Sequence, residues 1–190
     1  MLTISFDPFP MLVTDRLLLR RIEEHDVNEI FFIRSDKRVM EFIERHSAKS
    51  IDEAAQFIQN SDDLIKKNEA IQWGISLKNN AKLIGTICIW NISKENHRGE
   101  IGYVLMPGAQ GKGIMQEALT EVIIYGFQVI KLHSIEANVN PENIPSIKLL
   151  ERNNFKREGL FKENIFFDGK FFDTAIYSIL SQSHQEMKNA

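Results

Sequence analysis

A glycine-rich loop at residues 110–113 (QGKG) carries the clearest chemistry in the sequence. It stands between an extended apolar run at 101–106 and a segment whose apolar side chains recur every three or four positions from Ile114. That pattern predicts a strand, a loop and a helix. A helix start presents unpaired backbone N–H groups and the positive end of the helix dipole, and glycines at 111 and 113 let an anion approach the backbone closely. We therefore expect the loop to bind the phosphates of a ligand.

The loop differs from the two commonest nucleotide-binding loops. It has no Gly-Lys-Ser/Thr after four spacer residues, which a Walker A loop requires, and it lacks a complete G-x-G-x-x-G. The acidic residue that binds a ribose at a fixed spacing is also missing. A nucleotide-binding enzyme is therefore disfavoured.

The composition of the 190 residues limits the class of protein further. A net charge of −3 provides no basic surface for nucleic acid. The single cysteine, Cys88, is interpreted as a small buried hydrophobic residue, and the five histidines show no metal-binding spacing. The first residues do not form a signal peptide, and no run approaches the ~18 apolar residues of a membrane span. We expect a soluble, cytoplasmic protein with no metal.

The order of the predicted elements positions the loop. Alternating apolar residues predict strands, helical spacing predicts helices, and Ser50 with Glu53 forms a capping box that opens one helix. The predicted strands cover residues 16–21, 71–77, 83–90, 100–106, 134–140, 155–167 and 170–180, and the predicted helices cover 23–34, 39–43, 51–65, 114–129 and 143–152. Before and after them we expect an irregular lead-in at 1–13 and a frayed tail at 182–190. The order predicts one α/β (α+β) domain over residues 1–190.

The loop also resembles a family signature. Its order, Gln110-x-x-Gly113-x-Met115, is similar to the Q/R-x-x-G-x-G/A signature of the GNAT acetyltransferases, whose loop holds the pyrophosphate of coenzyme A. Met115 departs from the usual Gly or Ala, so its side chain is expected to point away from the phosphate. Further short sequence segments resemble those of the RimJ/RimL branch, the ribosomal-protein N-terminal acetyltransferases. They lie at 14–20, 83–87, 100–103, 140–146 and 154–159, and Asp173 and Tyr177 also fit.

The resemblance implies the GNAT fold, a mixed and mostly antiparallel sheet of seven strands with helices on both faces, splayed between its fourth and fifth strands. It implies an acetyl-CoA-dependent enzyme that moves an acetyl group directly to a primary amine, with no nucleic-acid or membrane partner, as a monomer or homodimer. The candidate acceptor is the N-terminus of a ribosomal protein, and a small amine (an antibiotic, a polyamine or an amino acid) is the alternative. A non-catalytic acyl-CoA-binding module is the rival interpretation.

The resemblance also implies catalytic residues. Glu100 is the first candidate for general base, acting through a water, and Glu163 in the sixth predicted strand is the competing candidate. An exposed or structural carboxylate is the alternative interpretation of Glu100. Ser146 falls where the branch places a residue proposed to protonate the leaving thiolate, although a serine in the first turn of a helix is also a common capping residue.

The expected contacts of coenzyme A follow from the same resemblance. The pantetheine arm should pair with the fourth predicted strand and the pyrophosphate with the backbone of the loop. Asn143 can instead be a turn or N-cap residue, and Lys112 and Arg152 can instead be surface residues. The full set is Val104, Leu105, Met106, Gln110, Gly111, Lys112, Gly113, Ile114, Met115, Asn138, Asn143 and Arg152.

Aromatic residues are candidates for the acceptor pocket. Trp73, Trp90 and Tyr103 can wall it, although large aromatic residues in strands more often belong to the core. Six phenylalanines crowd the last predicted hairpin. Alternate ones should be buried, and an exposed subset suggests a dimer face or a pocket lid.

Overall fold

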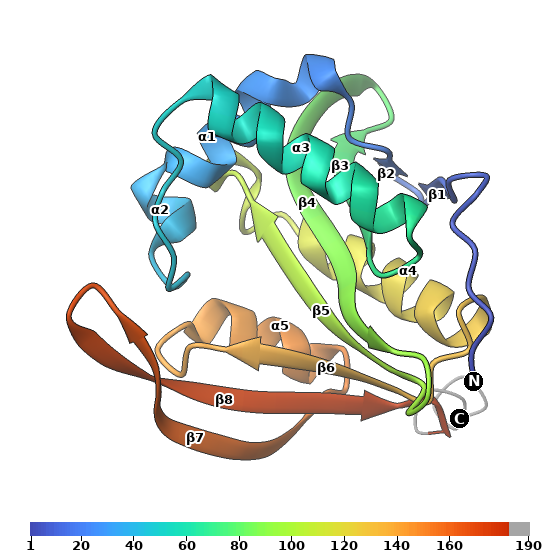
Figure 1. Cartoon of the computed structure of the whole chain (residues 1–190), viewed down its shortest axis with the longest axis vertical. Helices are drawn as coiled ribbons and strands as arrows, with labels where there is room; N and C mark the ends of the chain where they lie inside the picture. Colours follow the sequence, from blue (N-terminus) through green and yellow to red (C-terminus); the bar gives the residue numbers. More distant parts are fainter. Residues whose placement is uncertain (183–190) are drawn as a thin grey trace.

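The computed structural model describes residues 1–182, which fold around one eight-stranded sheet (Figure 1). The strands are β1 (Leu12–Val13), β2 (Leu17–Arg20), β3 (Ile71–Leu77), β4 (Asn80–Ser93), β5 (Arg98–Leu105), β6 (Ser134–Val139), β7 (Lys156–Phe167) and β8 (Lys170–Leu180). The helices are η1 (Glu24–Asp26), α1 (Val27–Ser35), α2 (Lys37–Met40), α3 (Ile51–Lys66), η2 (Pro107–Ala109), α4 (Ile114–Gln128) and α5 (Ile144–Arg152). The strand order is β1-β2-β3-β4-β5-β6-β8-β7. No helix within these 182 residues is long and apolar enough to cross a membrane.

The predicted fold is confirmed, with one strand more than expected. Leu12 and Val13 pair antiparallel with Leu19 and Leu18, so β1 lies inside the lead-in that was predicted to be irregular, and the sheet has eight strands rather than seven. A two-residue strand is too short to show an alternating pattern. The predicted tail lies, from residue 183 onward, outside the described residues.

Helices cover both faces of the sheet (Figure 1). On one face, α4 packs against Ile71, Trp73 and Ile75 of β3 in the main hydrophobic core. On the other face, α1 and α3 enclose a smaller core that includes Leu83. Ile71, Trp73 and Ile75 share one face because alternate side chains of a strand lie on the same side of the sheet.

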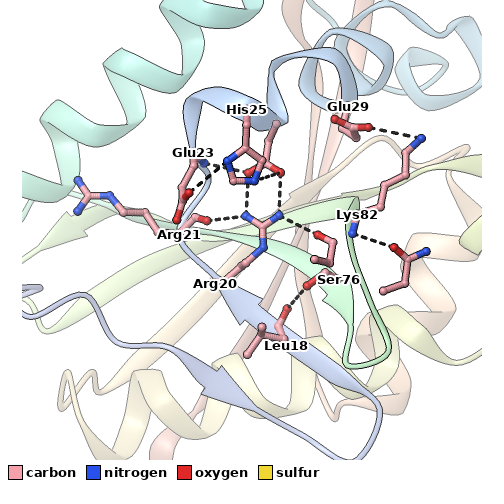
Figure 2. Close-up of polar contacts among 11 residues, drawn as sticks. Leu18, Arg20, Arg21, Glu23, His25, Glu29, Ser76 and Lys82 are labelled. Carbon is pink, nitrogen blue, oxygen red and sulfur yellow. Dashed lines mark hydrogen bonds and ion pairs between the residues drawn. The ribbon is translucent and has the colours of Figure 1, made fainter.

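A buried ion pair fastens the start of α1 to the sheet (Figure 2). Arg20 Nη1 and Nη2 each lie 2.7 Å from an oxygen of Asp26, and Asp26 Oδ2 also accepts the backbone N–H of Glu23 at 2.9 Å. Burial alone would raise the pKa of Asp26, but the hydrogen bonds from Arg20 and Glu23 outweigh it and lower the pKa. Arg20 also donates to the backbone oxygens of Arg21 and Ala81. The pair therefore joins β2, η1 and the start of β4.

Strands β5 and β6 separate after a short parallel contact. They pair only at Arg98–Ser134, Gly99–Ile135 and Glu100–Glu136. Beyond that point they diverge (Figure 1), and β6 stays paired with β8 on its other side. The predicted splay is thus confirmed, since β5 and β6 are the fourth and fifth of the predicted strands. From Ile101 to Leu105 the edge of β5 that faces β6 has no strand partner.

Candidate active site

A cavity of about 510 Å³ opens where β5 and β6 diverge. Its walls come from α1, the segment between α2 and α3, α3, β3 to β6, α5 and the β7–β8 hairpin. The predicted site residues that line it are Trp90, Glu100, Tyr103, Val104, Asn138, Asn143 and Ser146. Residues more than 50 positions apart in the sequence thus meet around one space.

Glu100 lies at the closed end of the gap, in the last residue pair that joins β5 to β6. Only 8% of its surface is exposed, and its Oε2 accepts a hydrogen bond from Asn91 Nδ2 at 2.9 Å. Burial raises the pKa of Glu100, although hydrogen bonds from Asn91 and Asn138 act against the shift, and the neighbouring Glu136 raises the pKa further. The carboxylate therefore binds a proton more tightly than an exposed glutamate does.

Two hydroxyl groups meet between β5 and α5. Tyr103 Oη and Ser146 Oγ lie 2.8 Å apart. Burial raises the pKa of Tyr103 to about 12, so the phenol keeps its proton at neutral pH. Asn143 is the N-cap of α5, because its Oδ1 accepts the backbone N–H of Ser146 at 3.1 Å. The hydroxyl of Ser146 is therefore not used for capping and stands at the cavity.

Cys88 also lines the cavity, as a protonated thiol. Its Sγ donates to the backbone oxygen of Gly102 at 3.5 Å, and burial raises its pKa to about 12. Since the thiolate is the nucleophilic form, Cys88 provides no nucleophile at neutral pH.

The glycine-rich loop precedes α4 and has the shape of an anion site. Gly111 and Gly113 both have a φ of +73°, a conformation that strains other residues. The side chain of Met115 is buried in the main core, so it points away from the loop, as expected. Within residues 1–182, the backbone N–H groups from Gly113 to Gln116 have no hydrogen-bond acceptor, whereas that of Glu117 donates to Gly113 O at 3.1 Å. Four free donors therefore point out of the positive end of α4.

A set of polar contacts holds this loop against the turn between β1 and β2. Glu117, in the first turn of α4, accepts the backbone N–H of Arg16 at 2.9 Å and its Nε at 2.6 Å, and it also accepts the hydroxyl of Thr14. Arg16 Nη1 donates to the backbone oxygen of Lys112 at 3.0 Å. A guanidinium group that the sequence did not assign to the site thus lies beside the predicted phosphate loop.

Comparison with known proteins agrees with this geometry. The family model described as Acetyltransferase (GNAT) domain matches residues 16–156. The chain belongs to the GNAT acetyltransferase family. It is 34% identical over 172 residues to the uncharacterized N-acetyltransferase YoaA of Bacillus subtilis (strain 168), with 90% of this chain and 97% of that protein covered. It is 29% identical over 181 residues to the [ribosomal protein uS5]-alanine N-acetyltransferase of Escherichia coli (strain K12), with 90% and 91% covered.

Solved structures of GNAT enzymes share the fold. The ribosomal-protein-S5-alanine acetyltransferase of Vibrio fischeri is similar with a TM-score of 0.81 at 28% identity, covering 90% of this chain and 97% of that one. A GNAT-family acetyltransferase of Bacillus anthracis gives a TM-score of 0.81 at 29% identity, with 91% and 99% covered. Membership of the family makes this chain an acetyl-CoA-dependent N-acetyltransferase.

Leu105, Met106 and the loop residues 110–115 are not part of the cavity lining, and three further predicted site residues of this GNAT enzyme also lie away from it. Trp73 is fully buried in the main core, where its Nε1 donates to the backbone oxygen of Pro10 at 2.7 Å. Glu163 is exposed where the pairing of β7 with β8 is irregular, and its backbone N–H donates to Asp173 Oδ1 at 2.8 Å. Arg152 is exposed at the end of α5. Trp73 thus takes the core position and Arg152 the surface position that were the alternative interpretations of these residues.

The long polar side chains of the GNAT loop donate to the backbone of the segment just before the loop. Gln110 Nε2 donates to Leu105 O at 3.1 Å, and Lys112 Nζ donates to Gly108 O at 2.7 Å. The backbone N–H groups at the start of α4 thus remain the donors of this segment that have no acceptor within residues 1–182.

Sequence reasoning did not find several polar residues at the site. Asn91 holds Glu100 from the adjacent strand, and Arg34 and Arg45 line the cavity from the helical side. No motif marks them, because their positions depend on the pairing of β4 with β5 and on how α1 and α3 lie over the sheet. Asn91 has a positive φ of 48°, a conformation that asparagine tolerates better than most residues. This backbone preference is the one local feature of the sequence that could have indicated Asn91.

Proposed function

We propose that the enzyme transfers the acetyl group of acetyl-CoA directly to a primary amine in the cavity, with Glu100 as the general base. The position of Glu100 carries the proposal: a buried carboxylate with a raised pKa faces the cavity at the closed end of the β5–β6 gap. A carboxylate whose pKa moves toward neutrality is a better acceptor for the proton of an ammonium group than an exposed glutamate. Asn91 and Asn138 orient it through their amides.

Coenzyme A supplies the thioester that activates the acetyl group. The free backbone donors from Gly113 to Gln116 fit its pyrophosphate, because a helix N-terminus favours negative charge. The Arg16 guanidinium lies beside them, ion-paired with Glu117. The unpaired edge of β5, from Ile101 to Leu105, offers backbone groups that can pair with the pantetheine arm. Asn138 stands across the gap on β6 and is a further candidate for the arm.

The hydroxyl pair of Tyr103 and Ser146 is proposed to return a proton to the departing sulfur. Ser146 Oγ would donate, Tyr103 Oη, 2.8 Å away and protonated at neutral pH, would restore the proton to Ser146, and Tyr103 would take a proton from solvent to complete the cycle. Because Cys88 keeps its own proton, the site offers no thiolate for an acyl-enzyme. The protonated Cys88 favours direct transfer over a covalent intermediate, and the hydroxyl pair at the cavity disfavours a non-catalytic binding module.

The first acceptor to test is the N-terminal amine of a ribosomal protein. Two relatives, from Escherichia coli and Vibrio fischeri, are named as acetyltransferases of the alanine of a ribosomal protein. A small amine is the second candidate, because a cavity of about 510 Å³ lies within the usual range for small-molecule pockets.

Thermal unfolding with acetyl-CoA, ATP or NAD tests the proposed co-substrate. A ligand at 100 times its Kd adds about 2.7 kcal/mol to the free energy of unfolding, so acetyl-CoA alone should raise Tm by roughly 5–10 °C. Release of free thiol with a panel of amines then tests transfer. No shift with acetyl-CoA, or a shift without thiol release for any protein N-terminus or small amine, would contradict the proposal.

A further inference from the structure

Arg34 places an unpaired positive charge at the cavity. It lies in the last turn of α1, its guanidinium stands 4.1 Å from the ring centre of Phe57, and it lines the cavity. Its Nε and Nη1 are buried and have no hydrogen-bond partner in the described part of the chain. Burial lowers the pKa of Arg34 to about 10, so the group is still charged at neutral pH. The stacking on Phe57 favours the charge but accepts none of these N–H groups, and a buried donor without an acceptor destabilises a fold.

Arg45 brings a second positive charge to the same cavity. It comes from the segment between α2 and α3, it is exposed, and it is among the residues that line the cavity. Its guanidinium forms no ion pair or hydrogen bond with any residue from 1 to 182. It lies near enough to Arg34 to lower the pKa of that residue by repulsion, and both Arg45 and Glu100 lie within electrostatic range of Cys88. Two like charges and the proposed base therefore face one space.

The carboxylates around the cavity are occupied elsewhere. Glu100 accepts from Asn91, Glu44 Oε1 accepts from Asn140 Nδ2 at 2.7 Å, and Asp173 Oδ1 accepts the backbone N–H of Glu163 at 2.8 Å. The carboxylate that acts on Arg34 is Glu53, which lies on α3 and whose Oε2 accepts the backbone N–H of Lys49 at 2.9 Å. None of the four is ion-paired with either arginine within the described residues.

We propose that Arg34 and Arg45 bind a carboxylate of the acceptor, so that the acceptor is an amine that also carries an acidic group. Guanidinium groups suit this role because their planar donors match both oxygens of a carboxylate. The proposal rests on the proposed function, since it places the amine of the same molecule at Glu100. It disfavours polyamines, whose additional positive charges the two arginines would repel.

The phosphates of coenzyme A do not explain the two arginines. The proposed phosphate donors lie at the start of α4, and α4 packs on the face of the sheet opposite to α1 (Figure 1). Arg34 therefore belongs to the acceptor side of the site. Its loss should leave the binding of acetyl-CoA unchanged.

The experiment compares acceptors that differ only in a carboxylate. One pair is free alanine and alaninamide, in which the acid is attached beside the amine; the other is the C-terminally amidated dipeptides alanyl-glutamate and alanyl-glutamine, in which the acid belongs to a neighbouring side chain. Spermidine serves as the cationic probe. Thiol release with acetyl-CoA should give a kcat/KM at least ~10-fold higher for the acidic member of one pair, and which pair responds identifies the source of the carboxylate.

Matched variants separate recognition from folding. Arg34→Met should abolish the preference, so that kcat/KM for the acid falls to the value for its amide measured on the same variant, and it should keep the Kd of acetyl-CoA. Arg34→Lys should restore part of the preference, because it restores the charge. Arg38→Met removes an exposed arginine of α2 that pairs with Asp36, and it should keep the preference intact. Calorimetric titration of the four acceptors into the complex with coenzyme A gives a readout that does not depend on turnover.

Equal kcat/KM values within both pairs, a preference for spermidine, or no difference in calorimetric binding between acid and amide would overturn this inference. So would a weaker Kd for acetyl-CoA in Arg34→Met. If amines react without any preference for the acid, only the acceptor assignment fails. If acetyl-CoA itself neither binds nor reacts, the proposed function fails as well, and thermal unfolding with acetyl-CoA distinguishes the two cases.

Discussion

Glu100 is a single side chain whose ionisation should set the pH dependence of the reaction. Because burial raises its pKa, the carboxylate forms at a higher pH than in an exposed glutamate, and kcat/KM should rise with pH along a limb whose midpoint lies above the ordinary value of 4.5. Glu100→Gln should remove this limb and lower kcat by about 100-fold or more, with the Kd of acetyl-CoA unchanged. A pH–rate profile of both proteins measures the effect.

The same substitution should affect stability and rate in opposite directions. A folded-state pKa above the unfolded value means that ionised Glu100 destabilises the fold at neutral pH and that protonation relieves this cost. Glu100→Gln should therefore keep or raise Tm while it lowers the rate. Glu163→Gln is the comparison: if that change, rather than Glu100→Gln, removed the pH limb, Glu163 would be the base.

Residue types along the sequence predicted part of this site. Glu100, Tyr103 and Ser146 were found through short sequence segments that the family shares, and the structure brings them to one cavity. These segments could not distinguish residues that line the cavity from residues of the core. Trp73 and Trp90 stand in similar strands, and only the strand register decides which face of the sheet each occupies. Arg34 and Arg45 had no local signal at all, since what singles them out is the lack of a partner in three dimensions.

At the scale of elements, the loop between η2 and α4 owes its function to its backbone. Gly113→Glu should weaken coenzyme A binding by more than tenfold, about 1.4 kcal/mol or more, because a side chain at a φ of +73° strains the backbone and its charge repels the phosphates. Calorimetry with coenzyme A measures the loss. Gly108→Glu is the control, since a Cβ at Gly108 meets nothing within 4 Å and its φ is not positive. An equal loss in both variants would show that added charge, rather than the position, is responsible.

Elements with strong periodicity were predicted well, and those without it were not. The central helix α4 and the β7–β8 hairpin at Asp168-Gly169 formed as expected. One half of the expected capping box of α3 formed, since Ser50 Oγ accepts the N–H of Glu53 at 3.3 Å, but the Glu53 carboxylate accepts the N–H of Lys49 instead of that of Ser50. Strand β1 was missed because two residues show no period. The lengths of β4 and β5 were underestimated, because their ends are polar and are held by backbone pairing rather than by an apolar face.

At the scale of the whole molecule, the Arg20–Asp26 pair should control stability in acid. The pKa of Asp26 is lowered in the folded state, so its contribution is complete above the unfolded pKa, near 4, and is lost as pH falls below that value. Arg20→Met should cost about 3–5 kcal/mol at pH 7, because it leaves a buried carboxylate unpaired. Urea unfolding at pH 7 and at lower pH measures both effects. The double variant Arg20→Met, Asp26→Leu should recover much of the loss, and failure to recover it would mean that the pair does more than satisfy its own charges.

The separation of β5 from β6 leaves this protein with a strand edge in its interior. Most unpaired edges lie at the rim of a sheet, where they invite another chain to add a strand and must be blunted to prevent aggregation. Here the edge lines a cavity whose walls also include α5 and the β7–β8 hairpin, where a slender extended molecule with amide groups can pair with it. In our assignment the pantetheine arm would act as a ninth strand. The polypeptide alone would then leave the β5 edge without hydrogen-bond partners, and the bound substrate would supply them in each catalytic cycle.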